Sequence, residues 1–152
     1  MERKSEMDEA KRSAQILIVD DDPDTVSILA RHLEREGYAP VGVNSGAECL
    51  KLLQDREFDV ILLDLMMPGM DGFQVCKALK NNPDTAEIPI IMVTARDDLD
   101  ARAEGMRLGV ADFIAKPVFR RQLGNRIRAQ LEAAAVGRKA MDTLQRIESA
   151  KK

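Results

Sequence analysis

The sequence has few aromatic and cysteine residues and no long apolar segment. Its 152 residues include no tryptophan and one tyrosine, which disfavours a platform of rings for stacking nucleic-acid bases. Cys49 and Cys76 form no CxxC pair and have no histidine partner, so a reducing cytoplasm fits better than a disulfide framework or a zinc site. No apolar run approaches the roughly 18 residues of a membrane span, and the charged N-terminus lacks the apolar stretch of a signal peptide. We expect a cytoplasmic protein without membrane contact.

The net charge of −3 conceals an uneven distribution along the chain. Residues 16–117 carry 19 acidic and 10 basic side chains, whereas residues 118–152 carry nine basic and three acidic ones. No aromatic or groove-reading motif accompanies the basic segment, so a solvated helix face explains it better than nucleic-acid contact. We expect no nucleic acid to be bound by this segment.

Short apolar runs alternate with stretches of helical periodicity. Continuous apolar strands bounded by amphipathic helices indicate a doubly wound α/β fold, with a five-stranded parallel sheet and helices on both faces. The strands are expected at residues 16–19, 39–43, 60–63, 90–93 and 113–115, and the helices near 23–36, 46–56, 73–80, 99–107 and from 119 onward.

We divide the chain into a charged N-terminal extension (1–14), one domain (15–132) and a helical C-terminal extension or linker (133–152). The last segment, AAAVGRKAMDTLQRIESAKK, is helix-prone but sparsely apolar, and Gly137 is a candidate break in it.

Three acidic residues follow strands of the expected sheet. Asp20 and Asp21 come directly after the first strand, and Asp64 directly after the third. If the strand order is 2-1-3-4-5, these strands are neighbours and their ends form one crevice, where ligands of such sheets bind. Carboxylates crowded together repel one another, so they need a cation. All-oxygen ligands favour Mg²⁺ (or Mn²⁺).

Two more polar side chains end strands at the same edge. Thr94 follows the fourth strand and Lys116 the fifth. A hydroxyl and an ammonium beside a carboxylate–metal site suit a phosphoryl group, because both can contact its oxygens. A carboxylate placed there can be the nucleophile and form an aspartyl-phosphate.

The chain resembles the receiver domain of two-component response regulators. The matching pieces are ILIVDDDP, DVILLDLMMPGMDG, IPIIMVTA and ADFIAKPV, within about residues 15–132. Their spacing matches as well, with 30 residues from Asp64 to Thr94 and 22 from there to Lys116. The resemblance implies a flavodoxin-like fold with strand order 2-1-3-4-5.

The resemblance also implies roles for individual residues. Asp64 resembles the phospho-acceptor, Asp21 the direct Mg²⁺ ligand and Asp20 a ligand acting largely through water, while Met66 would offer its backbone carbonyl to the metal. Thr94 and Lys116 match the hydroxyl and the lysine of the family's motif. The Lys116–Pro117 bond matches the cis peptide bond of the family. Thr94 and Phe113 together resemble the switch pair, although the family often has tyrosine in place of Phe113.

The implied function is a phosphorylation-controlled switch rather than an enzyme acting on other molecules. A sensor histidine kinase or phosphotransfer protein would donate the phosphoryl group. Phosphorylation would reshape the face made by the fourth helix, fifth strand and fifth helix. Asp112 and Arg126 of this face resemble dimer salt-bridge residues of the DNA-binding branch, so the resemblance makes this the face through which a homodimer could form. It would be weak, because Gln122 replaces an acid there and the C-terminal segment forms a poor coiled-coil seam.

Two other functions remain open from the residues. The first is an aspartate-nucleophile phosphatase of haloacid-dehalogenase type, disfavoured because Asp24 stands where its DxDx[TV] motif needs Thr or Val. The second is a protein-interaction module that is not phosphorylated, which loss of an acidic residue, Thr or Lys would favour; none is lost.

Two residues are predicted to gate the water that would hydrolyse an aspartyl-phosphate. Met66 lies two residues after Asp64, and Arg96 two residues after Thr94. An apolar side chain cannot orient an attacking water, and a guanidinium could lie across the phosphoryl oxygens. We therefore expect slow loss of the phosphoryl group.

Overall fold

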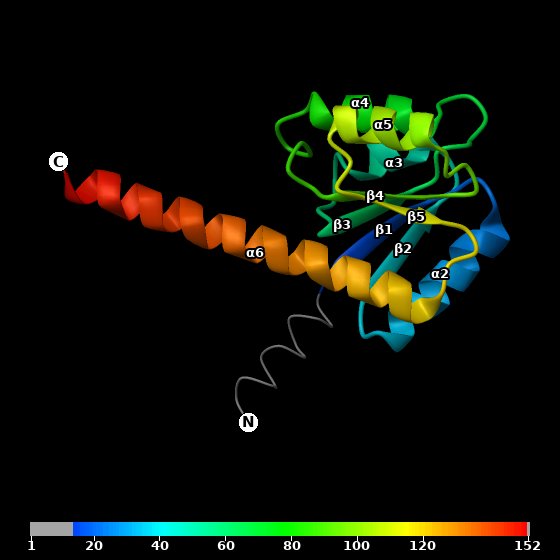
Figure 1. Ribbon diagram of the computed structural model, residues 1–152, viewed down its shortest axis with the longest axis horizontal. Helices are drawn as coiled ribbons and strands as arrows, with labels where there is room; N and C mark the ends of the chain where they lie inside the picture. The colour runs from blue at the N-terminus through cyan, green and yellow to red at the C-terminus, as the bar shows by residue number, and fades with distance from the viewer. Residues whose placement is uncertain (1–13, 152) are drawn as a thin grey trace.

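A computed structural model of the chain describes residues 14–151 and contains one parallel sheet in this range. Its strands lie in the order β2-β1-β3-β4-β5 (Figure 1), which confirms the expected topology. Every pair of neighbouring strands is parallel. The strands are β1 (Gln15–Val19), β2 (Ala39–Val43), β3 (Val60–Leu63), β4 (Ile90–Thr94) and β5 (Asp112–Ala115).

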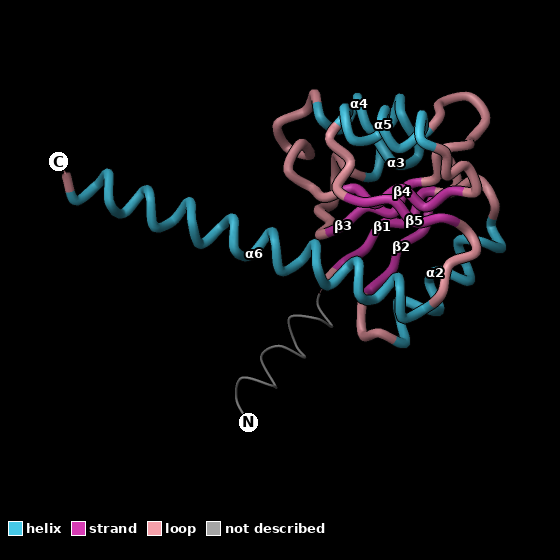
Figure 2. Tube along the Cα trace, in the orientation of Figure 1, coloured by secondary structure: helices cyan, strands magenta, loops and turns pink. Residues whose placement is uncertain are grey.

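Helices cover both faces of this sheet, as Figure 2 shows. One face carries α3 (Gly46–Leu52), α4 (Gly72–Lys80) and α5 (Leu99–Leu108), and the other carries α2 (Pro23–Arg35) and α6 (Arg120–Ala150). Successive strand residues point to opposite faces. Leu17, Leu63 and Met92 therefore join the core under α3, α4 and α5, whereas Ile18 and Leu62 join the core with α2 and α6. The near-continuous apolar strands thus fill two cores.

Polar caps explain where the helices begin. Asp22 and Ser45 are the N-caps of α2 and α3, and each accepts a hydrogen bond from a backbone N–H of the first turn. Beyond α2, Gly37 has a φ of 89°, a left-handed conformation that favours glycine at a helix end. Helix α3 was expected to reach residue 56 but ends at Leu52. The hydrogen bonds that follow span three residues instead of four; for example, the N–H of Asp55 donates to the carbonyl of Leu52.

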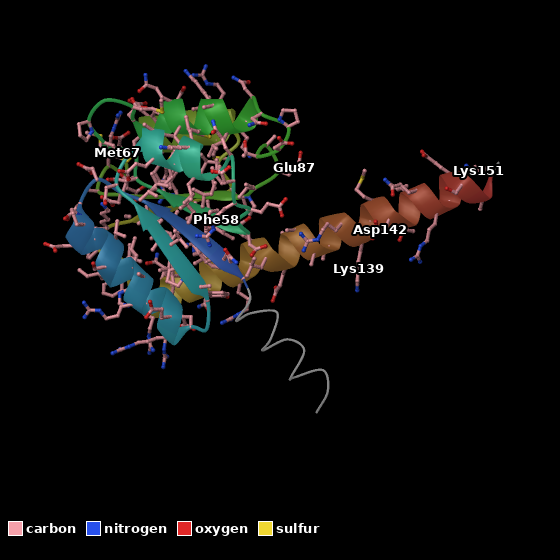
Figure 3. The ribbon with its side chains drawn as sticks, turned by 180° about the vertical axis from the view of Figure 1, so that it is seen from behind. Phe58, Met67, Glu87, Lys139, Asp142 and Lys151 are labelled. Carbon is pink, nitrogen blue, oxygen red and sulfur yellow. The ribbon has the colours of Figure 1, made fainter. Side chains whose placement is uncertain are left out.

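Helix α6 continues well beyond the domain (Figures 1 and 3). Its first turns bury Leu123 and Ile127, whereas residues 135–150 are exposed, and Lys139 and Asp142 are labelled on this projecting part in Figure 3. Gly137 does not break the helix, because one glycine costs only about 1 kcal/mol.

The expected extension at residues 1–14 lies outside the described residues except for Ala14. The domain boundaries stay a prediction. Within the described range, no helix is both long enough and apolar enough to cross a membrane.

Candidate functional site

Three carboxylates meet at the carboxyl ends of β1 and β3. Val19 pairs with Leu63 in the register of these strands, and the N–H of Asp64 donates to the Val19 carbonyl at 2.9 Å. The residues that follow the two strands are therefore neighbours. Ligand oxygens of Asp20, Asp21 and Asp64 lie within 4.8 Å of one another. The structure thus brings together the three acidic residues singled out in the sequence.

These carboxylates differ in their exposure. Asp20 and Asp64 are only 2% and 5% exposed, whereas Asp21 is exposed to solvent. Burial, followed by the charge of Asp20, raises the pKa of Asp64 above its usual value, although Lys116 opposes the shift. The two buried carboxylates therefore lie in a site that favours an added positive charge.

Lys116 connects the two buried carboxylates. Its Nζ donates to Oδ2 of Asp20 at 2.8 Å and to Oδ2 of Asp64 at 3.5 Å. Burial alone would lower the pKa of Lys116, but the hydrogen bond to Asp20 and the charge of Asp64 raise it. The peptide bond from Lys116 to Pro117 is cis, as the resemblance implies.

Thr94 ends β4 at the same edge and is fully buried. Its side chain lies close enough to the carboxylate of Asp64 to act to lower the pKa of that group. The Thr94 Oγ1 also accepts the N–H of Arg96 at 3.2 Å. The carboxylates, the ammonium and the hydroxyl thus occupy one small region.

The donor set fits a hard divalent cation. It consists of carboxylate oxygens, two of them buried, and Mg²⁺ takes one or two carboxylates together with waters. Because Asp21 is exposed, solvent can reach the site.

A family model for the response regulator receiver domain matches residues 16–128. The chain belongs to this family. Among curated proteins, the receiver chain is 44% identical over 117 residues to the "Heme response regulator HssR" of Staphylococcus aureus. That match covers 77% of the chain and 51% of the relative, so the chain spans about half the length of the curated relatives it matches. The chain is therefore a response regulator receiver domain of two-component signalling.

Solved receiver domains share this fold. The signal receiver domain of a signal transduction histidine kinase from Syntrophus aciditrophicus has a TM-score of 0.74 and 34% identity, and the match covers 80% of this chain and 92% of that one. The receiver domain of sensor histidine kinase PA1611 from Pseudomonas aeruginosa has a TM-score of 0.73 and 25% identity, with coverages of 79% and 98%. The latter holds a magnesium ion in its active-site cleft.

Sequence reasoning missed one polar residue of this receiver site. The side-chain amide of Asn44, which follows β2, donates to the backbone carbonyl of Asp20 at 3.1 Å. Its own N–H donates to Oε2 of Glu48 at 2.8 Å. Asn44 therefore fixes the loop that carries the acidic pair. Its place just after a strand, at the edge that holds the site, was the available signal.

Gly72 also has a role that the sequence did not reveal. Asp71, which precedes it, is the N-cap of α4, in a capping box with Gln74. A Cβ at Gly72 would lie 2.5 Å from the carbonyl oxygen of Asp64 and 2.7 Å from Cα of Leu65. Only glycine lets α4 begin this close to the end of β3.

The two predicted water-gating residues line one hollow of about 410 Å³ beside the site, also lined by Asp71 and Phe73. Met66 is 59% exposed and its N–H donates to Oδ1 of Asp64 at 3.3 Å. Arg96 forms an ion pair, with its Nε 3.0 Å from Oδ2 of Asp98. Arg96 is thus held by α5's N-cap. Its role toward a phosphoryl group, like that of Met66, stays a prediction.

Two expectations about the output face take a different form in the structure. Phe113, which resembles one half of the switch pair, already lies in the interior and is only 6% exposed. Asp112 and Arg126 pair within the chain, since Nη1 of Arg126 lies 2.9 Å from both carboxylate oxygens. These groups would have to exchange partners to form salt bridges between subunits.

Proposed function

We propose that this receiver domain is a Mg²⁺-dependent phospho-accepting switch in which Asp64 takes the phosphoryl group from a phosphohistidine. The donor would be a sensor histidine kinase or a phosphotransfer protein of the cytoplasm. The observation that supports it most is the arrangement of Lys116 Nζ, which hydrogen-bonds to both Asp20 and Asp64 at the carboxyl edge of the sheet. A lone ion pair would need only one of these carboxylates.

In the transfer, a carboxylate oxygen of Asp64 attacks phosphorus as the bond from phosphorus to the histidine nitrogen breaks. The electron pair of that bond stays on the imidazole, and the product is an aspartyl-phosphate. Lys116 stands beside Oδ2 of Asp64, where its ammonium can neutralise a phosphoryl oxygen. The Thr94 hydroxyl, which lies near the same carboxylate, can donate a hydrogen bond to a second phosphoryl oxygen.

Asp20, Asp21 and Asp64, with the backbone carbonyl of Met66, would hold Mg²⁺ or Mn²⁺. The bound ion would supply positive charge to the phosphoryl oxygens. Of the chain's own groups, Lys116 keeps Asp20 in place, and the capped loop around Asp71 shapes the wall of the site.

The face made by α5, β5 and α6 is the proposed output surface, for a partner or for a weak homodimer. Because the match covers only 51% of the curated relative, we assign no effector to a full-length protein. We propose no enzymatic activity beyond self-catalysed phosphorylation and slow self-dephosphorylation.

Acetyl phosphate with Mg²⁺ tests the proposal. Intact-mass spectrometry should show one added phosphoryl group on the wild-type chain and none on Asp64→Asn. Asp55→Asn, a change in the exposed turn after α3, is the matched control and should label normally. Full labelling of Asp64→Asn, or absence of labelling in the wild type, would contradict the proposal. Steady turnover of a chromogenic phosphate ester would instead indicate the phosphatase.

A further inference from the structure

Arg102 of α5 lies over the ring of Phe113. Its guanidinium carbon is 5.4 Å from the ring centroid, within the range of a cation–π interaction. The guanidinium also forms an ion pair with Asp97, in the loop that precedes α5. Arg102 is therefore tied at its end to one loop while covering a buried ring of the neighbouring strand.

The ring also lies close to the backbone of α5. A Cβ at Gly105 would lie 2.9 Å from Cε2 of Phe113, so the ring occupies the space a side chain would need. Gly105 and Arg102 are three residues apart and share one side of the helix. The helix thus provides a gap for the ring at Gly105 and a cationic cover at Arg102.

Phe113 lies on the same face of the sheet as Thr94. Phe113 pairs with Met92 in the register of β4 and β5, and Thr94, two residues after Met92, points to that same face. The loop that follows Thr94 carries Asp97, the partner of Arg102. One short segment therefore connects the hydroxyl of the site to the group that holds Arg102.

We propose that Arg102 is a positioning residue that holds Phe113 in its buried position and thereby favours the phospho-accepting arrangement of Thr94 and Asp64. This inference rests on the proposed function. Phe113 has no hydroxyl with which to form a polar contact of its own, and the guanidinium supplies a polar interaction through the ring face instead.

The expected effect follows from the strength of a cation–π contact at a partly exposed site. Losing it shifts the equilibrium between the buried and released positions of the ring by about twofold to fivefold. A ligand that binds only the buried state loses affinity by up to the same factor, because its apparent affinity scales with the fraction of competent protein.

Beryllofluoride, a mimic of the phosphoryl group, provides the probe. Its apparent dissociation constant at fixed Mg²⁺, measured by an NMR titration, should rise in Arg102→Gln, by up to about fivefold. Arg102→Lys, which keeps a cation, should lie closer to wild type. Arg107→Gln is the matched control, since Arg107 pairs with Glu104 on the exposed side of the same helix. An unchanged constant in Arg102→Gln, or an equal change in Arg107→Gln, would overturn the proposal.

A double-mutant comparison separates positioning from general stability. If Arg102 acts through the ring, Arg102→Gln should have no further effect on the beryllofluoride constant in a Phe113→Leu background. An undiminished effect in that background would refute the role of the ring.

A second readout needs no ligand at all. In metal-free protein, a soluble paramagnetic agent should relax the Phe113 ring protons more strongly in Arg102→Gln than in wild type, and equal relaxation would contradict the proposal. If wild type binds no beryllofluoride, the proposed function fails, whereas this measurement still decides what Arg102 does to the ring.

Discussion

Replacing Asp64 by asparagine should stabilise the metal-free protein at neutral pH, although it removes the phospho-acceptor. The carboxylate is 5% exposed and lies within 4.8 Å of ligand oxygens of Asp20 and Asp21. Burial and the charge of Asp20 raise its pKa, which means that its ionised form is unfavourable in the fold. An amide has the same shape without the charge, and its oxygen can still accept the Met66 N–H.

The size of the effect follows from opposing charges. With an effective dielectric constant of about 20, a carboxylate no more than 4.8 Å from Asp64 repels it by at least about 3.5 kcal/mol, and an ammonium at 3.5 Å attracts it by about 5 kcal/mol. These terms largely offset one another, which leaves the cost of burying the charge. We expect Asp64→Asn to gain about 1–2 kcal/mol in free energy of unfolding, or roughly 3–10 °C in Tm.

The gain should depend on pH in a defined direction. Because the pKa of Asp64 is raised on folding, the folded state binds this proton more tightly than the unfolded chain does. The wild type therefore loses stability as pH rises from about the usual value of 3.8 through the raised value. The variant lacks this loss, so its advantage should be present at neutral pH and shrink as the pH falls toward 3.8.

Urea unfolding in the presence of a chelator, at a series of pH values, measures this difference, with Asp55→Asn as the control. Adding Mg²⁺ should narrow the difference in stability between the two proteins. At ten times its Kd the ion stabilises wild type by about 1.4 kcal/mol, and it should stabilise Asp64→Asn less. A variant that is less stable than wild type at pH 7, or whose advantage grows on acidification, would refute the electrostatic reasoning.

The remaining predictions concern the surroundings of the site. After donor removal, Met66→Asn and Arg96→Glu should lose the phosphoryl group faster than wild type, and unchanged decay in both would show that neither gates water. Gly72→Ala should lower the free energy of unfolding by about 1–3 kcal/mol through overpacking and weaken the stabilisation by Mg²⁺. A Tm at or above that of wild type would contradict the close approach of Gly72 to Asp64 and Leu65. Sedimentation with beryllofluoride should show weak dimerisation that Arg126→Ala alters through its pair with Asp112, whereas identical mass with and without the ligand would exclude the homodimer.

The sequence was sufficient to predict the sheet because its strands are short apolar runs between amphipathic stretches. The strand order placed Asp20 and Asp64 side by side, and the structure confirms that placement. Helix ends were less predictable. Residues 53–56 continue a helical pattern, yet the chain tightens after Leu52. Gly137 lies within a continuous helix because the cost of one glycine, about 1 kcal/mol, is too small to end it.

Side-chain pairings were the least accessible from sequence, because they depend on orientations that periodicity does not specify. The pairing of Arg96 with Asp98 and the contact of Arg102 with Phe113 both join residues a few positions from the recognised motif. The amide of Asn44 reaches across from β2 to the Asp20 carbonyl. Such contacts could be identified only from the three-dimensional arrangement of the side chains.

The central claim is that Asp64, and not its acidic neighbours, carries the phosphoryl group. Borohydride converts an aspartyl-phosphate to homoserine, so tandem mass spectrometry of peptides from the phosphorylated and reduced protein locates the acceptor. The account predicts homoserine at position 64 alone, lost in Asp64→Asn and retained in Asp55→Asn. Homoserine at position 20 or 21, or none at position 64 in a labelled protein, would contradict it.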